Sequence, residues 1–143
     1  MLHPGIPTGV HVLLWREGRV LLMRRAGTGF FDGLYSLPGG HLEEGESIPM
    51  TAAREMAEEL DIRLDPAALR TLGVVHRRSD TNRIDFFVEA RAWTGEPRIA
   101  EPDKCDALHW CAPEALPEAM VPYVRTALQA GAGPWVLELG WKV

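Results

Sequence analysis

The chain has 143 residues, of which 46% are apolar and 24% are charged, so it is long enough for one globular domain with a hydrophobic core. Its formal net charge of -5 argues against a surface that binds duplex nucleic acid through phosphate contacts. The longest apolar runs, such as residues 10–15, are far shorter than the roughly 20 residues of a membrane span, and the first residues lack the pattern of a secretory signal. Cys105 and Cys111 are expected to be free thiols in a reducing cytoplasm. We therefore expect a single cytoplasmic domain over residues 1–143.

Two apolar runs, residues 9–15 and 19–25, flank the turn sequence REG and predict a β-hairpin. The next stretch, residues 26–47, contains six glycines and one proline, too many for a regular helix or strand. It predicts a long loop with a short strand near residues 35–37. Loops of this length inside a compact domain are often functional.

Residues 48–60 are expected to form an α-helix, because Ser47 can cap its start and Pro49 is tolerated in its first turn. Apolar residues at helical spacing would give this helix one face toward the core. They are Ala52, Ala53, Met56 and Leu60.

The second half of the chain predicts another hairpin, residues 69–78 and 83–93 around the turn sequence SDTN, and a further strand over residues 106–112. A helix over residues 117–129 is expected to end at AGAG. Trp135 and Trp141, in the apolar tail, are expected to cover either the core or a homodimer seam. His11, His76 and His109 lie on predicted strands and are expected to be core or surface residues rather than catalytic ones. This mixture predicts an α/β domain with helices packed on a mixed sheet.

An unusual cluster of acids occurs in the first predicted helix. Glu55, Glu58 and Glu59 stand at positions i, i+3 and i+4, so their carboxylates share one side of the helix. Each like-charge pair costs roughly 0.2–0.5 kcal/mol when nothing lies between the charges. A Mg²⁺ ion would reverse this repulsion, since it binds carboxylates, water and phosphates. The alternative is a solvated acidic face on which Arg63 pairs with Glu59.

The loop before this helix favours a metal site. Gly39 and Gly40 would let backbone groups approach a ligand closely, and Glu46 adds another acid. From Gly40, the chain continues with five residues, Glu46, seven residues and then REMAEELDI. This 23-residue segment resembles the Nudix box, the signature of hydrolases that cleave nucleoside diphosphates linked to another group, and agrees with it at eight of nine fixed positions. The resemblance implies a Nudix-type α/β/α sandwich with a mixed β-sheet.

One position departs from the box, because Asp61 stands where the family has glycine. The position falls just after the helix, where a left-handed residue commonly closes the last turn. Aspartate can adopt that conformation at some cost in strain. We expect the helix end to be kept and the chemistry to be little affected.

The resemblance also implies that the box carboxylates hold one to three Mg²⁺ or Mn²⁺ ions, which bridge phosphate oxygens and activate a water molecule. By position, Glu58 and Glu59 are the expected metal ligands, and the carbonyl of Gly39 is a further candidate. Glu55 resembles the ligand or general base. Glu101, outside the box, is either an additional carboxylate or a surface acid.

Arg54 and Glu46 resemble a supporting pair in the box. The guanidinium fork of Arg54 can hold carboxylates in place, so that the ligand geometry survives without metal. The candidate catalytic residues are therefore Glu55, Glu58, Arg54 and Glu46.

Substrate contacts are expected from the strand and loop before the box. Arg24 and Arg25 end a predicted strand, and strand alternation would direct only one of them toward the site. Either guanidinium could bind phosphate or remain solvated. Phe31 and Tyr35 lie in the long loop, where an aromatic ring either stacks on a base or packs in the core.

The segment 101–117 resembles the corresponding part of MutT-like nucleoside triphosphate and dihydroneopterin triphosphate pyrophosphatases. Branches of the family that act on ADP-ribose tend to carry a proline well downstream of the box, and those that act on diadenosine polyphosphates a tyrosine. Between Ile62 and Asp85 the only proline is Pro66, almost adjacent to the box, and there is no tyrosine. The resemblance therefore favours a triphosphate. The expected reaction is Mg²⁺-dependent hydrolysis of a nucleoside triphosphate, or an oxidised or pterin analogue, to monophosphate and pyrophosphate. The alternatives are hydrolysis of another nucleoside diphosphate derivative, such as a sugar nucleotide, ADP-ribose or NADH, a non-catalytic nucleotide-binding regulatory module, and a structural domain.

Overall fold

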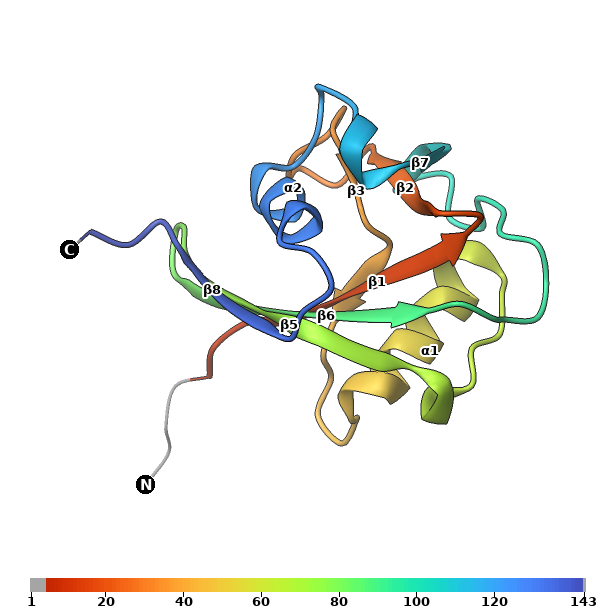
Figure 1. The fold of residues 1–143 in the computed structure, drawn as a ribbon, viewed down its shortest axis with the longest axis horizontal. Helices are drawn as coiled ribbons and strands as arrows, with labels where there is room; N and C mark the ends of the chain where they lie inside the picture. Colours follow the sequence, from red (N-terminus) through yellow and green to blue (C-terminus); the bar gives the residue numbers. More distant parts are fainter. Residues whose placement is uncertain (1–4, 143) are drawn as a thin grey trace.

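The computed structural model describes residues 5–142 (Figure 1). Its elements are, in chain order, β1 (Thr8–Arg16), β2 (Arg19–Arg25), β3 (Tyr35–Ser36), β4 (Gly39–His41), α1 (Ile48–Leu60), the 3-10 turn η1 (Pro66–Ala68), β5 (Arg70–Arg78), β6 (Asn82–Ala90), β7 (Cys105–Cys111), the 3-10 turn η2 (Pro113–Ala115), α2 (Pro122–Gln129) and β8 (Trp135–Leu139).

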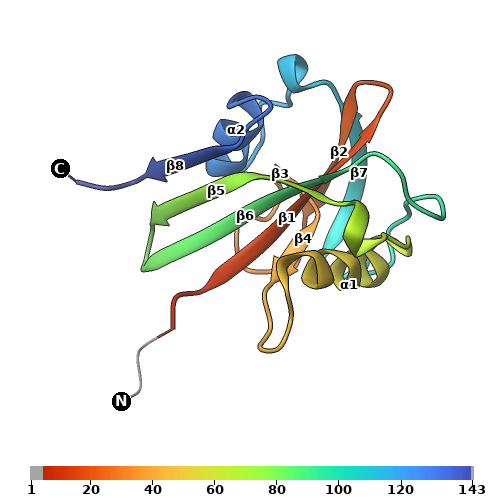
Figure 2. The ribbon, with the colours of Figure 1, turned by 60° about the horizontal axis from the view of Figure 1, so that its bottom comes forward.

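The strands form a mixed sheet in the order β3-β2-β1-β6-β5-β8, with β4 paired to β1 and β7 to β2. Strand β1 is antiparallel to β2 and β4 but parallel to β6. In this register Gly9 lies opposite Asp85, and His11 lies opposite Phe87. Figure 2 shows α1 on one face of the sheet and α2 on the other. The expected α/β/α sandwich is confirmed.

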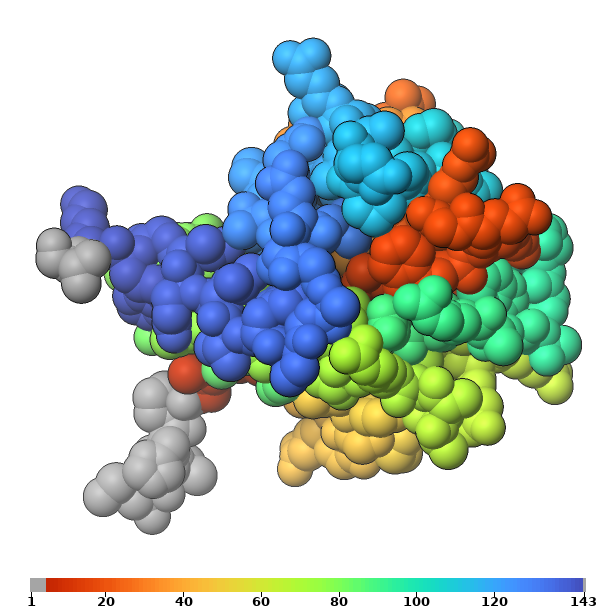
Figure 3. Space-filling model, in the orientation of Figure 1, coloured from red at the N-terminus to blue at the C-terminus, as the bar shows by residue number. Residues whose placement is uncertain are grey.

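Strand alternation divides the core between the two faces of the sheet. Val10 and Val12 of β1 pack toward α1, whereas Leu13 packs toward α2. Met56 is fully buried on the α1 side, and Phe87 is fully buried on the α2 side. The space-filling view shows the C-terminal segments, in blue, lying against the strands of this second face (Figure 3).

Local signals determine both ends of α1 as expected. The Ser47 hydroxyl accepts a hydrogen bond from the Met50 amide at 3.2 Å, which caps the start. Asp61 adopts the left-handed conformation, with φ 55° and ψ 40°, and closes the end. Its carboxylate also accepts a hydrogen bond from Nε of Arg98 at 2.9 Å.

The second helix is shorter than predicted. Helix α2 begins at Pro122 rather than at residue 117. The residue before a proline is held out of the helical region, and Val121 has φ −59° and ψ 122°. The backbone of residues 119–121 also forms hydrogen bonds with β3. Ala119 accepts a hydrogen bond from the Tyr35 amide, and the Val121 amide donates one to the Tyr35 carbonyl, both at 2.9 Å. The segment therefore runs beside β3 instead of coiling.

The apolar tail forms an edge strand, β8, parallel to β5. The ring of Trp135 packs against Phe87 at 5.5 Å between centroids, and Trp141 packs against His76 at 4.7 Å. Both tryptophans thus have partners within the chain, and nothing demonstrates the homodimer seam.

Cys105 and Cys111 are free, as predicted; both are buried and lie at opposite ends of β7. Neither of the helices within residues 5–142 is long and apolar enough to cross a membrane.

Candidate active site

A glycine pair brings the acidic helix against the sheet. Gly39 and Gly40 belong to β4, which pairs with His11 and Val10 of β1. A Cβ atom on Gly40 would overlap the carboxylate of Glu55, and one on Gly39 would overlap the carbonyl of Val10. Only glycine at these two positions allows α1, β4 and β1 to approach this closely.

Arg54 connects the acids around the start of α1. Its Nε and Nη2 donate to both carboxylate oxygens of Glu46, at 2.7 and 3.0 Å. Nη1 donates to Glu55 at 2.8 Å, and Nη2 also donates to the His41 carbonyl at 3.1 Å. The hydrogen bonds from Arg54 lower the pKa of Glu46 to about 2, so this carboxylate stays ionised.

The pKa of Glu59 is shifted in the opposite direction to that of Glu46. Burial, together with the charge and hydrogen bond of Glu55, raises the pKa of Glu59 to about 9, although a backbone hydrogen bond from Gly39 opposes the shift. Glu101, on the loop after β6, adds to the negative potential at Glu59. The carboxyl group of Glu59 therefore stays protonated well above its usual range, beside the charge of Glu55.

The side chains of Glu55, Glu58 and Glu59 do not all point to the same place. Glu55 and Glu59 lie together, whereas the Glu58 side chain is 49% exposed and accepts from Arg54 Nη1 at 3.4 Å. In residues 5–142, no three acidic, His or Cys side chains are already grouped closely enough to ligate an ion. The ligand atoms available are all oxygen, and a cation between Glu55 and Glu59 would relieve the repulsion between their carboxylates. This set fits a hard divalent cation. The structure brings Glu55 and Glu59 together and turns Glu58 toward Arg54, and the assignment of all three as metal ligands stays a prediction.

A cleft of about 320 Å³ lies on the other side of the glycine pair. Gly39, Gly40 and Arg25 line it, together with Phe30 and Phe31, which are 63% and 43% exposed. Nε of Arg25 donates to the Phe30 carbonyl at 2.7 Å, and this hydrogen bond holds the aromatic loop to β2. The cleft thus combines the guanidinium of Arg25 with two exposed phenylalanine rings, beside Glu55 and Glu59.

Arg24 and Tyr35, two of the candidate substrate contacts, do not line this cleft. Because side chains alternate along β2, Arg24 points away from Arg25, and its Nε donates to Asp106 at 2.7 Å. The ring of Tyr35 packs against His109, with 5.9 Å between centroids. Of the two expected arginines, only Arg25 reaches the cleft.

The cleft also contains a buried polar network that the sequence reasoning missed. Asp85 is 4% exposed and accepts from Arg77 Nε at 2.8 Å, while His11 Nε2 lies 3.1 Å from its other oxygen. Burial would raise the pKa of Asp85, but the hydrogen bonds from His11 and Arg77 outweigh it and lower the pKa. The Tyr123 hydroxyl lies 3.3 Å from His11 Nε2, and burial raises the pKa of Tyr123 to about 12. The available signal was Asp85 itself, a charged residue at a core-facing position of an apolar strand.

The fold and this site together define a hydrolase of phosphoric anhydrides. The NUDIX domain model matches residues 5–131, and the chain belongs to the Nudix family. Within that family it is a MutT-like pyrophosphohydrolase, as its relatives indicate.

Two curated relatives and one solved structure establish this similarity. A MutT-like protein of Streptomyces ambofaciens is 30% identical over 128 residues, covering 87% of this chain and 77% of the relative. A CTP pyrophosphohydrolase of Escherichia coli is 30% identical over 107 residues, covering 73% and 75%. The crystal structure of a MutT NUDIX hydrolase from Burkholderia pseudomallei is 32% identical, with a TM-score of 0.80 over 88% of this chain and 98% of that one.

Proposed function

We propose that the protein hydrolyses a nucleoside triphosphate, or an oxidised or pterin analogue, to the monophosphate and pyrophosphate, with Mg²⁺ or Mn²⁺ as cofactor. The observation that carries this proposal is the glycine pair. Gly39 and Gly40 both line the cleft. On the other side Gly40 lies against Glu55, and the backbone of Gly39 is hydrogen-bonded to Glu59. A nucleoside in the cleft would therefore direct its phosphates across the glycines toward Glu55 and Glu59.

Some of these residues would bind the substrate, and others would hold the metal ion. Exposed Phe31 can stack on the base, a contact worth about 1–3 kcal/mol, and Arg25 can attract the phosphates. Glu55, Glu59 and the Gly39 carbonyl would hold the divalent ion, with Glu58 and Glu101 as additional carboxylates. When bound, the ion would neutralise phosphate oxygens and make water acidic enough to attack phosphorus.

Arg54 and Glu46 act as positioning residues in this mechanism. The bidentate hydrogen bonds between them fix the guanidinium, which in turn holds Glu55 at 2.8 Å. Glu55 then keeps its orientation beside Glu59, and one carboxylate of this pair can accept the proton of the attacking water.

The test is a panel of nucleotides with Mg²⁺ at mildly alkaline pH, in which monophosphate, pyrophosphate and orthophosphate are measured separately. We expect equal amounts of monophosphate and pyrophosphate from at least one triphosphate. Glu55→Gln and Glu59→Gln should abolish most of the rate. The control is Glu44→Gln, which changes an exposed acid in the loop before α1 and should leave the rate unchanged. No hydrolysis of any nucleotide on a broad panel would refute the proposal.

The panel should include the alternative substrates. Release of AMP from ADP-ribose or NADH in preference to any triphosphate would indicate the other branch of the family. Tight nucleotide binding without turnover would indicate a regulatory module. We further propose a cytoplasmic location, which the two free, buried thiols support.

A further inference from the structure

A second hollow lies beyond the other end of α2. Its volume is about 270 Å³, and it shares no lining residue with the cleft beside the glycine pair. Both hollows open on the α2 face of the sheet: Val121 and Tyr123 line the cleft, and Ala127 and Leu128 line the second hollow. It is therefore a separate cavity, not an extension of the proposed active site.

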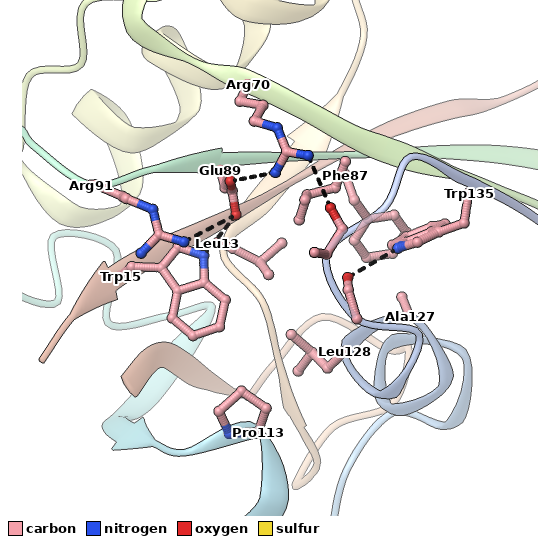
Figure 4. Close-up of a pocket in the computed structure, with 13 residues that line it drawn as sticks. Leu13, Trp15, Arg70, Phe87, Glu89, Arg91, Pro113, Ala127, Leu128 and Trp135 are labelled. Carbon is pink, nitrogen blue, oxygen red and sulfur yellow. Dashed lines mark hydrogen bonds and ion pairs between the residues drawn. The ribbon is translucent and has the colours of Figure 1, made fainter. Parts of the chain in front are cut away.

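The walls of this hollow are mainly aromatic and aliphatic. The indole of Trp15 stands on one side and Leu128 on another, with Leu13, Phe87 and Trp135 around them (Figure 4). Protein interiors usually close such voids, because unfilled apolar surface loses packing contacts. The size is slightly below that of typical drug-binding pockets, so a single ring with a short substituent fits it.

Charged groups gather at one rim of the hollow (Figure 4). The carboxylate of Glu89 is buried, with 7% of the residue exposed, and accepts from Trp15 Nε1 and Arg70 Nη1, each at 2.9 Å. The guanidinium of Arg91 lies above the Trp15 ring at 5.4 Å, and its Nη2 is 3.9 Å from Glu89. Two guanidiniums thus face one carboxylate, which leaves one net positive charge.

The guanidinium of Arg91 has hydrogen-bond donors that are available to a ligand. Its side chain is 69% exposed, and it donates no hydrogen bond to any other part of the described chain. Glu89 already has strong donors on both oxygens, so it offers little to a cationic ligand. A planar anion would meet the free donor fork of Arg91 while its body rests on the rings below.

We propose that this hollow binds a small aromatic carboxylate. The carboxylate pairs with Arg91 at the rim, and the ring packs between Trp15 and Leu128. Aromatic walls favour an aromatic body, since ring pairs gain energy beyond the area they bury. Phe87 connects this site to the active-site cleft, because its ring lines the hollow and stacks on His11 with 4.8 Å between centroids. A ligand that shifts Phe87 therefore acts on a residue of the nucleotide cleft.

The test is ¹⁹F NMR of the full chain labelled with 5-fluorotryptophan, whose five signals are assigned by single Trp→Phe replacements. Phenylacetate, its neutral isostere phenylacetamide and the cation phenethylamine are titrated separately. Phenylacetate should shift the Trp15 and Trp135 signals saturably, with a Kd of millimolar order, and leave Trp141 unchanged. Phenylacetamide should bind about tenfold more weakly, and phenethylamine should not bind.

Two variants separate the rim from general charge effects. Arg91→Gln should weaken phenylacetate binding about tenfold or more, because a charge-assisted hydrogen bond is lost. Arg63→Gln, an exposed arginine near the end of α1, should bind as the wild type does. Equal responses to the three probes, no saturable shift of Trp15 and Trp135, or unchanged binding by Arg91→Gln would overturn the proposal. The readout is binding alone, so it is independent of nucleotide hydrolysis.

Discussion

Replacing Glu59 by glutamine should make the metal-free protein more stable and the enzyme less active. Burial, together with the neighbouring Glu55, raises the pKa of Glu59 from 4.5 to about 9. The unfolded chain ionises this carboxyl above pH 4.5, whereas the folded protein keeps it protonated until the pH approaches 9. Because the unfolded state binds fewer protons over this range, the free energy of unfolding falls as the pH rises through it.

The size of the effect follows from the same shift. Each pH unit above 4.5 costs about 1.4 kcal/mol, so the ceiling at pH 7 is about 3 kcal/mol. The Glu59 side chain is only partly shielded from solvent, which offsets part of this cost, so we expect Glu59→Gln to gain about 1–3 kcal/mol at pH 7. The gain should vanish near pH 4.5 and be larger at pH 8.5.

The assay is urea unfolding in the presence of EDTA at pH 5, 7 and 8.5. Wild type and Glu59→Gln are compared with Glu44→Gln, which should resemble the wild type at each pH. In parallel, the rate of nucleotide hydrolysis with Mg²⁺ should fall by about two orders of magnitude or more in Glu59→Gln, because a ligand charge is lost.

Two results would refute this reasoning. If Glu59→Gln is less stable than the wild type at pH 8.5, or if the difference does not grow with pH, Glu59 does not carry the electrostatic cost assigned to it. If the variant is more stable but keeps full activity, the cost is real and the assignment of Glu59 as a metal ligand is wrong.

Other changes test separate parts of the site. Arg54→Gln should lower the melting temperature above pH 5, but not near pH 2. The ionised Glu46 that pairs with Arg54 contributes stability that is lost as the pH falls from 4.5 toward about 2. Equal losses of melting temperature at both pH values would contradict this. Gly40→Ala should reduce kcat strongly, because its Cβ would displace Glu55; circular dichroism checks that the fold remains. Phe31→Ala should raise KM for the nucleotide about tenfold with little change in kcat, and an unchanged KM would exclude base stacking on this ring.

Short-range signals in the sequence predicted α1 well. Ser47 and Asp61 cap the helix locally, so its bounds need no knowledge of the rest of the fold. The start of α2 was missed, because Pro117 and Pro122 can both begin a helix. Only the pairing of residues 119–121 with Tyr35 decides between them.

The site was predictable where one element contains it and less so where distant strands meet. Helical spacing predicted that Glu55, Glu58 and Glu59 share one side of α1, and the box predicted the pairing of Arg54 with Glu46, which the structure shows. The sequence could not reveal that Glu58 turns toward Arg54 instead of toward Glu59. The His11 contact with Asp85 was also hidden, since it depends on the parallel register of β1 and β6.

The left-handed Asp61 has a consequence for the opposite side of the acidic pair. The carbonyls of Leu60 and Glu59 accept hydrogen bonds from the amides of Arg98 and Ala100, at 3.1 and 3.0 Å, and the Arg98 side chain is bound to Asp61. A glycine at position 61 would close the helix equally well but would leave Arg98 without this anchor. Aspartate in place of glycine thus adds an ion pair between the end of the helix and the segment that leads to Glu101.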